Sequence, residues 1–71
     1  MTFPTLLLNQ LLATATTIGP DDKGRYTVGE INAQFLRDGH SVEDWRVAVE
    51  EGKKSGRIEM HRSGSFFTIT Q

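Results

Sequence analysis

A chain of 71 residues is long enough for one domain with a small core and too short for two. It contains no cysteine, which excludes disulfide bonds and thiolate metal sites as sources of stability. Its net charge of −1 contrasts with the clearly basic balance usual in proteins whose affinity comes mostly from neutralising phosphates.

The first predicted helix runs from Pro4 to Thr16 and is rich in leucine. Thr2 is expected to cap it, and proline is tolerated in a first turn, where a backbone N–H lacks a partner anyway. Helical spacing assigns four residues to one apolar face: Leu7, Leu8, Leu11 and Ala15. Leu12 widens this face, and Leu6 lies outside it. The Gly-Pro pair at 19–20 ends the helix.

This leucine-rich segment lacks the marks of a targeting or membrane-spanning sequence. No Lys or Arg precedes Lys23, and the Asn-Gln pair at 9–10 interrupts the leucines. A secretory signal needs a positive start and an unbroken apolar stretch, and a membrane helix needs about 20 apolar residues. We therefore expect a cytoplasmic protein that does not associate with membranes.

A second helix is predicted after a turn-rich loop at 20–24 and a very short strand at 25–27. Thr27 and Glu30 have the spacing of a capping box. The helix is expected to end at the Asp-Gly pair 38–39. Its inward face is predicted to consist of Val28, Ile31, Phe35 and Leu36.

The third predicted helix runs from Val42 to about Ser55, with Ser41 as its cap. Because a turn of very few residues joins it to the second helix, the two must cross at a steep angle. We expect Trp45 to anchor the core. The predicted inward face is Val42, Trp45, Ala48, Val49 and Gly52, and the outward face is centred on Glu43, Val47, Glu50 and Lys54.

A hairpin is predicted after the third helix, with residues 63–64 as a two-residue turn. That turn sets a register in which apolar residues face one another: Met60 with Phe67, and Ile58 with Ile69. Alternation then assigns the opposite face to Glu59, His61, Phe66, Thr68 and Thr70. Phe66 is therefore predicted to be an aromatic residue that faces away from the core.

This order of elements resembles winged helix-turn-helix domains from Tyr26 to Thr70, and the leucine-rich first helix extends the likeness to nearly the whole chain. The capped second helix, the DGHS turn at 38–41 and the GRI step at 56–58 carry the resemblance. It implies an α+β fold: one domain, 1–71, of three helices packed on a small antiparallel sheet of two or three strands. Where the family usually has a large aliphatic residue, this chain has Gly52, so either Trp45 fills the space or another group packs against the backbone.

The resemblance implies a third helix in the DNA major groove and a wing on the backbone or minor groove. The first hypothesis is therefore a DNA-binding transcriptional regulator of bacterial or phage type, dimeric through leucines of the first helix. Arg46 is expected to contact guanine or phosphate, Val47 a thymine methyl group and Glu43 a cytosine. Phosphate contacts are expected from six further residues: Ser41, Lys53, Lys54, His61, Arg62 and Ser63.

Charge balance supports an alternative. From residue 41 to 57 four acids match four bases, and Arg46–Glu50 and Glu50–Lys54 have the spacing of ion pairs within a helix. Such a face can be merely solvated, or belong to a module that binds another protein through exposed apolar side chains. The residues expected to form that contact are Leu6, Leu12, Val47 and Phe66. RNA binding is weaker, because no platform of stacked aromatic rings is predicted.

Nothing in the sequence predicts catalysis, a cofactor or a metal ion. There is no nucleophile motif, glycine-rich phosphate loop or paired Cys/His spacing. His40 and His61 are expected to be surface histidines without fixed acidic partners. The adjacent Asp21 and Asp22 are too few for an oxygen-ligand cage.

Overall fold

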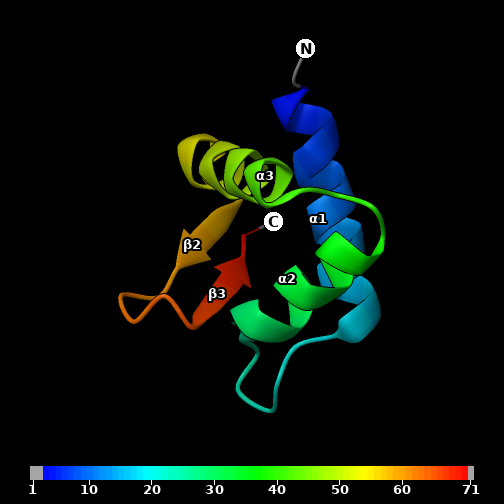
Figure 1. The fold of residues 1–71 in the computed structure, drawn as a ribbon. Coiled ribbons are helices and arrows are strands. Elements are labelled where there is room, and N and C mark those ends of the chain that lie inside the picture. The colour runs from blue at the N-terminus through cyan, green and yellow to red at the C-terminus, as the bar shows by residue number, and fades with distance from the viewer. Residues whose placement is uncertain (1–2, 71) are drawn as a thin grey trace.

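The computed structural model describes residues 3–70 and has an α+β fold, with three helices and one antiparallel sheet of three strands (Figure 1). The elements in chain order are α1 (Pro4–Ile18), β1 (Tyr26–Thr27), α2 (Val28–Arg37), α3 (Val42–Ser55), β2 (Ile58–Met60) and β3 (Phe66–Ile69). Within the described residues, no helix has the length and apolar character needed to cross a membrane.

The α1 helix places its predicted leucine face in the core. Leu8, Leu11 and Ala15 are fully buried, and Leu7 and Leu12 pack partly buried against them. The helix has Phe3 as its N-cap, without a side-chain hydrogen bond; the predicted cap, Thr2, lies outside the described residues. It continues to Ile18, two residues beyond the predicted end, before Gly19 ends it at a φ of +88°.

The α2 helix buries Ile31 and Phe35 as predicted, but the predicted capping box at its start is wrong. Thr27 is the N-cap residue and makes no side-chain cap hydrogen bond. It is also the last residue of β1 and pairs with Phe66 of β3. The sheet continues the pairing at the first helical residue, where the Val28 N–H donates to the Ser65 carbonyl at 3.0 Å. A backbone carbonyl thus satisfies a helix N–H that would otherwise need a side chain.

His40, in the short connection between α2 and α3, was expected to be an unpartnered surface residue, and this is wrong. Its ring stacks on Phe35, with centroids 4.1 Å apart and planes 12° apart. Its Nδ1 lies 3.9 Å from a carboxylate oxygen of Asp44. The histidine therefore covers the edge of the core where the chain turns from α2 to α3.

The α3 helix is rotated relative to the predicted orientation. Ala48 and Gly52 are buried as expected, but Val42 is 72% exposed and Val47 is half-buried. The centre of the buried face is shifted around the helix axis by about 50°, half of the 100° between successive helical residues. It brings Val47 beside Pro4 of α1, since both line one surface hollow.

Gly52 explains part of this packing. A Cβ at residue 52 would lie 2.6 Å from Cδ1 of Ile58, so the missing side chain admits the first residue of β2. Of the two expectations for this position, close packing against the backbone is therefore correct. Trp45 is not the core anchor: it is half-buried and meets Phe35 edge-on at 5.8 Å. The largest fully buried side chains are Phe35 and Phe67.

The sheet has the strand order β1-β3-β2, and its hairpin has the predicted register. Ile58 pairs with Ile69, and Met60 with Phe67. The predicted turn is displaced: the Gly64 N–H donates to the His61 carbonyl at 2.9 Å, which centres the turn on residues 62–63. The connection of residues 62–65 is longer than the predicted two-residue turn by one residue on each strand, so the register of the strands is unchanged.

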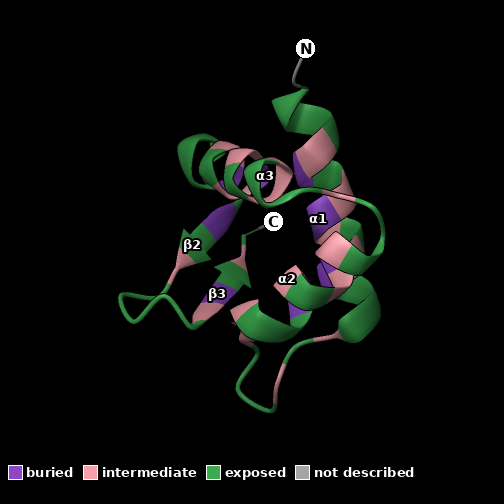
Figure 2. Ribbon diagram, in the orientation of Figure 1, coloured by how far each residue is buried: buried purple, intermediate pink, exposed green. Residues whose placement is uncertain are grey.

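The core lies between the sheet and the helices. In Figure 2 the buried positions lie on the sides of the helices and strands that face one another, and the hairpin loop is exposed throughout. Tyr26 of β1 joins the core side by stacking on Phe67, with centroids 5.5 Å apart. By strand alternation, Arg25, His61 and Phe66 lie on the opposite side of the sheet.

Candidate functional site

The exposed side of α3 gathers four of the nine residues predicted to bind DNA: Glu43, Arg46, Lys53 and Lys54. We call it the α3 face; its six exposed residues are Val42, Glu43, Arg46, Glu50, Lys53 and Lys54. The rotation of the helix places Arg46 and Lys53 nearer the centre of this face than predicted, and removes Val47 from it. The sequence predicts that Val42 faces the core, which is wrong: its side chain is exposed beside these charges.

Arg46 forms an ion pair with Glu43, at 2.5 Å between guanidinium and carboxylate atoms. This hydrogen bond, with the nearby negative charge, raises the pKa of Arg46 above its ordinary value. The predicted Arg46–Glu50 and Glu50–Lys54 ion pairs are not found within residues 3–70. Helical neighbours three and four residues apart are equally accessible, so spacing cannot choose between them. Both Arg46 and Glu43 are more than 60% exposed, so their pairing is weak.

Ser41 and Asp44 form the N-terminal cap of α3 as a capping box. The Asp44 N–H donates to the Ser41 hydroxyl at 3.0 Å, and the Ser41 N–H donates to the Asp44 carboxylate at 3.0 Å. The carboxylate of Asp44 is therefore engaged with the backbone and lies outside the α3 face. The Ser41 hydroxyl still has its hydrogen to donate to a phosphate.

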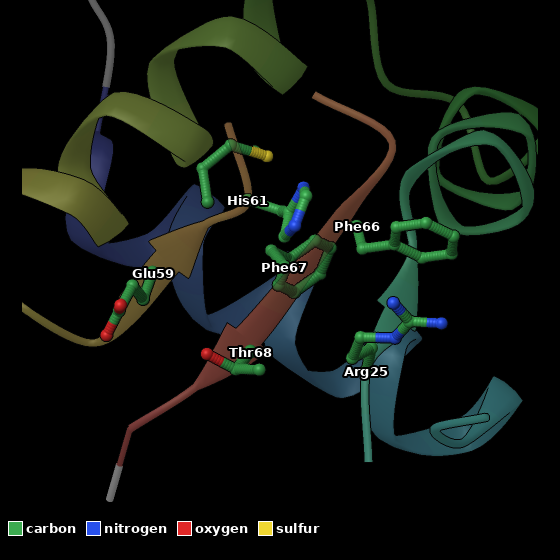
Figure 3. Close-up of a pocket in the computed structure, with 7 residues that line it drawn as sticks. Arg25, Glu59, His61, Phe66, Phe67 and Thr68 are labelled. Carbon is green, nitrogen blue, oxygen red and sulfur yellow. The ribbon is translucent and has the colours of Figure 1, made fainter. Parts of the chain in front are cut away.

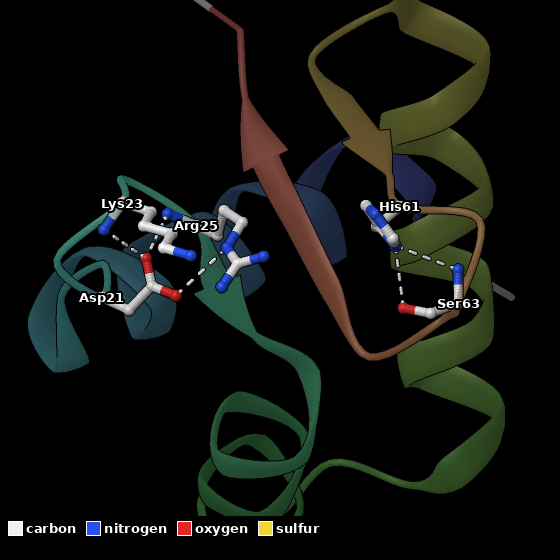
Figure 4. A network of polar contacts seen from close by, with 5 residues as sticks. All are labelled: Asp21, Lys23, Arg25, His61 and Ser63. Carbon is white, nitrogen blue, oxygen red and sulfur yellow. Dashed lines mark hydrogen bonds and ion pairs between the residues drawn. The ribbon is translucent and has the colours of Figure 1, made fainter.

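The hairpin tip, residues 61–65, is held by its own side chains (Figure 4). His61 Nδ1 accepts the Ser63 N–H at 3.1 Å and lies 2.8 Å from the Ser63 hydroxyl. In neutral His61 the hydrogen is therefore on Nε2, which is left free to donate to a ligand. The Ser63 hydroxyl oxygen also accepts the Ser65 N–H at 3.2 Å, and this hydrogen bond stabilises the turn. Arg62, also exposed, is the fixed positive charge of the tip.

The four apolar residues predicted to bind a protein partner are not gathered in one place. Leu12 and Val47 are half-buried within the chain's own packing, and Phe66 is half-buried on the sheet. Leu6 is 53% exposed, as predicted, and Phe3, which the sequence analysis missed, is 56% exposed beside it. We call residues 3–6 the Phe3–Leu6 patch, since they line a common surface hollow.

A second cluster lies on the outer sheet face (Figure 3). The sequence predicts that Phe66 and His61 share this face, but not that Arg25 joins them. The Arg25 guanidinium lies 4.2 Å from the centre of the Phe66 ring. Asp21 fixes Arg25 from the other side: one carboxylate oxygen lies 3.2 Å from its Nε, and the other accepts its backbone N–H at 2.8 Å. That backbone hydrogen bond is the main cause that lowers the pKa of Asp21. We define the outer sheet face as Arg25, Glu59, His61, Phe66 and Thr68.

Within residues 3–70, no group of three or more His, Cys, Asp or Glu side chains is placed to hold a metal ion. No protein-family model, curated protein sequence or solved structure matches the chain. What the site can do must therefore follow from its own geometry: a mixed-charge helix face, an exposed hairpin tip, and a stacked cluster on the outer sheet face.

Proposed function

We propose that the chain is a winged-helix domain that binds double-stranded DNA through the α3 face and the hairpin tip. In this proposal it acts as a transcriptional regulator of bacterial or phage type. The order of helices and strands, the connection of residues 38–41 between α2 and α3, and the β2–β3 hairpin all support it. In Figure 1, β2 starts beside the C-terminal end of α3, so the hairpin extends from the same side of the molecule.

The observation that carries this proposal is the composition of the α3 face. Arg46, Lys53 and Lys54 are exposed there together. One nearby acid, Asp44, is engaged by the helix cap, and Glu43 is bound to Arg46 in an exposed ion pair that a phosphate or guanine can replace at low cost. Val42 adds an apolar group suited to a thymine methyl. Glu50 remains as an opposing charge and limits non-specific affinity.

The size of the electrostatic contribution follows from the number of cations. Arg46, Lys53 and Lys54, with Arg62 at the hairpin tip, could neutralise three or four phosphates. The logarithm of the binding constant should then fall with the logarithm of salt concentration with a slope of about −3 to −4. The protein should accordingly bind duplex DNA at low salt and lose most of that affinity at physiological salt.

The test is a salt series of titrations with a random-sequence duplex pool. Arg46→Gln should weaken binding at least about fivefold and reduce the salt slope by about one. The matched control is Arg37→Gln, which removes an exposed arginine from α2, where its one side-chain hydrogen bond within residues 3–70 is to Gln34; this variant should bind like the wild type. Glu50→Gln should strengthen binding. Absence of duplex binding below about 50 mM salt would refute the proposal.

A second candidate function, binding of a protein, rests on the Phe3–Leu6 patch. Most leucines of α1 pack into the chain's own core, which leaves Leu6 and Phe3 as the apolar surface at the start of the helix. A second copy is one partner this patch could take, and a dimer would double the contacts to DNA. Sedimentation of the wild type and Leu6→Lys tests it: a wild type that is monomeric at high micromolar concentration contradicts the dimer.

A further inference from the structure

The outer sheet face carries three planar groups on a surface that α3 does not share. They are the Phe66 ring, the Arg25 guanidinium stacked on it at 4.2 Å, and the His61 ring, which meets Phe66 edge-on at 6.3 Å. Hydrogen bonds hold both flanking groups in place, Arg25 through Asp21 and His61 through Ser63. The three groups are thus arranged before any ligand arrives.

These groups line a hollow of about 110 Å³ that is open to solvent. The other lining residues are Glu59, Met60, Phe67 and Thr68. Drug-sized ligands occupy pockets of roughly 300–1,000 Å³, whereas a closed apolar cavity of about 150 Å³ holds one benzene molecule. The hollow therefore suits a single flat ring that stays partly in solvent, and excludes a large cofactor.

We propose that this hollow binds one unpaired nucleobase, with its phosphate beside Arg25. Every base has a flat face that stacks on an aromatic ring or on a guanidinium plane. His61 presents Nε2–H, and Arg25 has guanidinium N–H groups beyond the Nε that faces Asp21, so both can donate to base or phosphate oxygens. The proposal goes beyond duplex binding by α3 and does not depend on it.

Charge decides what kind of binding to expect. In the two segments that carry this face, residues 21–25 and 59–62, the bases Lys23, Arg25 and Arg62 are matched in number by the acids Asp21, Asp22 and Glu59. Phosphate attraction is therefore small, and stacking should provide most of the affinity. Binding of a single strand should be weak, with a salt slope of about −1, much shallower than that for duplex on the α3 face.

The first test uses the unmodified protein, so it does not depend on a variant that folds. Thymidine monophosphate is titrated while the nuclear magnetic resonance signals of the Arg25, His61 and Phe66 side chains are followed. Ring-current shifts should be largest at these three residues. A labelled strand of about ten thymidines should shift the same signals at lower concentration. If neither ligand shifts them at low salt, the proposal is wrong.

The second test compares two aromatic deletions by fluorescence anisotropy with the labelled strand. Phe66→Leu should weaken binding at least about fivefold, the lower end of what one stacked base contributes. Its matched control, Phe3→Leu, removes an exposed ring at the start of α1 and should leave the binding affinity within about twofold of that of the wild type. Equal effects of the two variants would overturn the site.

Two further variants separate this site from its rivals. Arg46→Gln, which should weaken duplex binding, should not change single-strand binding; an equal loss would place the strand on α3 and overturn the proposal. Glu59→Gln removes a carboxylate from the lining of the hollow and should strengthen binding of the anionic strand, by roughly twofold. Tighter binding of an aromatic dipeptide than of the strand would assign the hollow to a protein side chain, which also overturns it.

Discussion

At the scale of single residues, Gly52 and Asp21 matter for opposite reasons. Gly52 is buried because it lacks a side chain, and the space is taken by Ile58. Asp21 acts through its side chain: it accepts the backbone N–H groups of Lys23 and Arg25 at 2.9 and 2.8 Å and so closes the loop before β1. Both residues also support the surfaces described above, one by seating α3 on β2 and the other by fixing Arg25.

Gly52→Ala should destabilise the protein although alanine favours helices. The new methyl would overlap Ile58, and such overpacking costs about 1–3 kcal/mol, against about 1 kcal/mol gained in helix propensity. In the background of Ile58→Ala, Cδ1 and Cγ1 are absent and only Cβ remains, 3.0 Å from the added methyl, so the same change should cost much less or be neutral. Urea unfolding of the four proteins of this cycle measures the coupling, and purely additive effects would contradict the proposed contact.

Asp21→Asn should reduce stability at neutral pH and not at low pH. The pKa of Asp21 is lowered below its ordinary value of 3.8, so its charged form stabilises the fold. That stabilisation is present above the unfolded-state pKa and is lost as the pH falls through the lower, folded-state pKa. Free energies of unfolding measured from pH 6 down to about pH 2 should therefore converge for the two proteins. A constant difference would mean that the carboxylate charge is not responsible.

At the scale of elements, the helices begin in different ways. The start of α3 has a full capping box between Ser41 and Asp44. The start of α2 has a threonine at the same position without a side-chain hydrogen bond, because the sheet runs directly into the helix. The sequence shows similar capping patterns at both sites, and only one of them forms.

Ser41→Ala should therefore cost about 1 kcal/mol of stability, which lowers the melting temperature by about 4–8 °C in a domain of this size. Thr27→Ala is the matched control, and should cost less than half as much since no capping hydrogen bond is lost. Thermal unfolding followed by circular dichroism compares the two. Equal losses would indicate that Thr27 caps α2 in solution.

At the scale of the whole molecule, the fold is small and its core has few members. The radius of gyration is 11.0 Å, which matches the value of about 11 Å for a compact domain of this length. Among residues 3–70, eight form the buried core. Stability of about 0.05–0.15 kcal/mol per residue gives a total of about 4–11 kcal/mol, so one core residue supports a large share of it.

Leu11→Ala should cost about 2–5 kcal/mol and leave a marginally folded protein, because Leu11 is fully buried. Leu6→Ala is the same change at an exposed position of the same helix. It should change stability by less than about 0.5 kcal/mol, since Leu6 is 53% exposed. Urea unfolding at low protein concentration measures both. A large, concentration-dependent loss for Leu6→Ala would show instead that the Phe3–Leu6 patch is covered by a second copy.

The amino-acid sequence by itself determined the elements, their inward leucines and the hairpin register. These depend on spacing within one segment: a period of 3.6 in helices and of 2 in strands fixes which residues share a face. The tertiary structure alone decided the rotation of α3, which exposed Val42 and covered Val47, and the stack of Arg25 on Phe66. A helix with few apolar residues fits its own pattern over a range of rotations, so contacts with α1 and Ile58 select one. The Arg25–Phe66 stack joins residues that are far apart in the chain. Local sequence patterns cannot predict such a contact, because they describe only residues that are close in sequence.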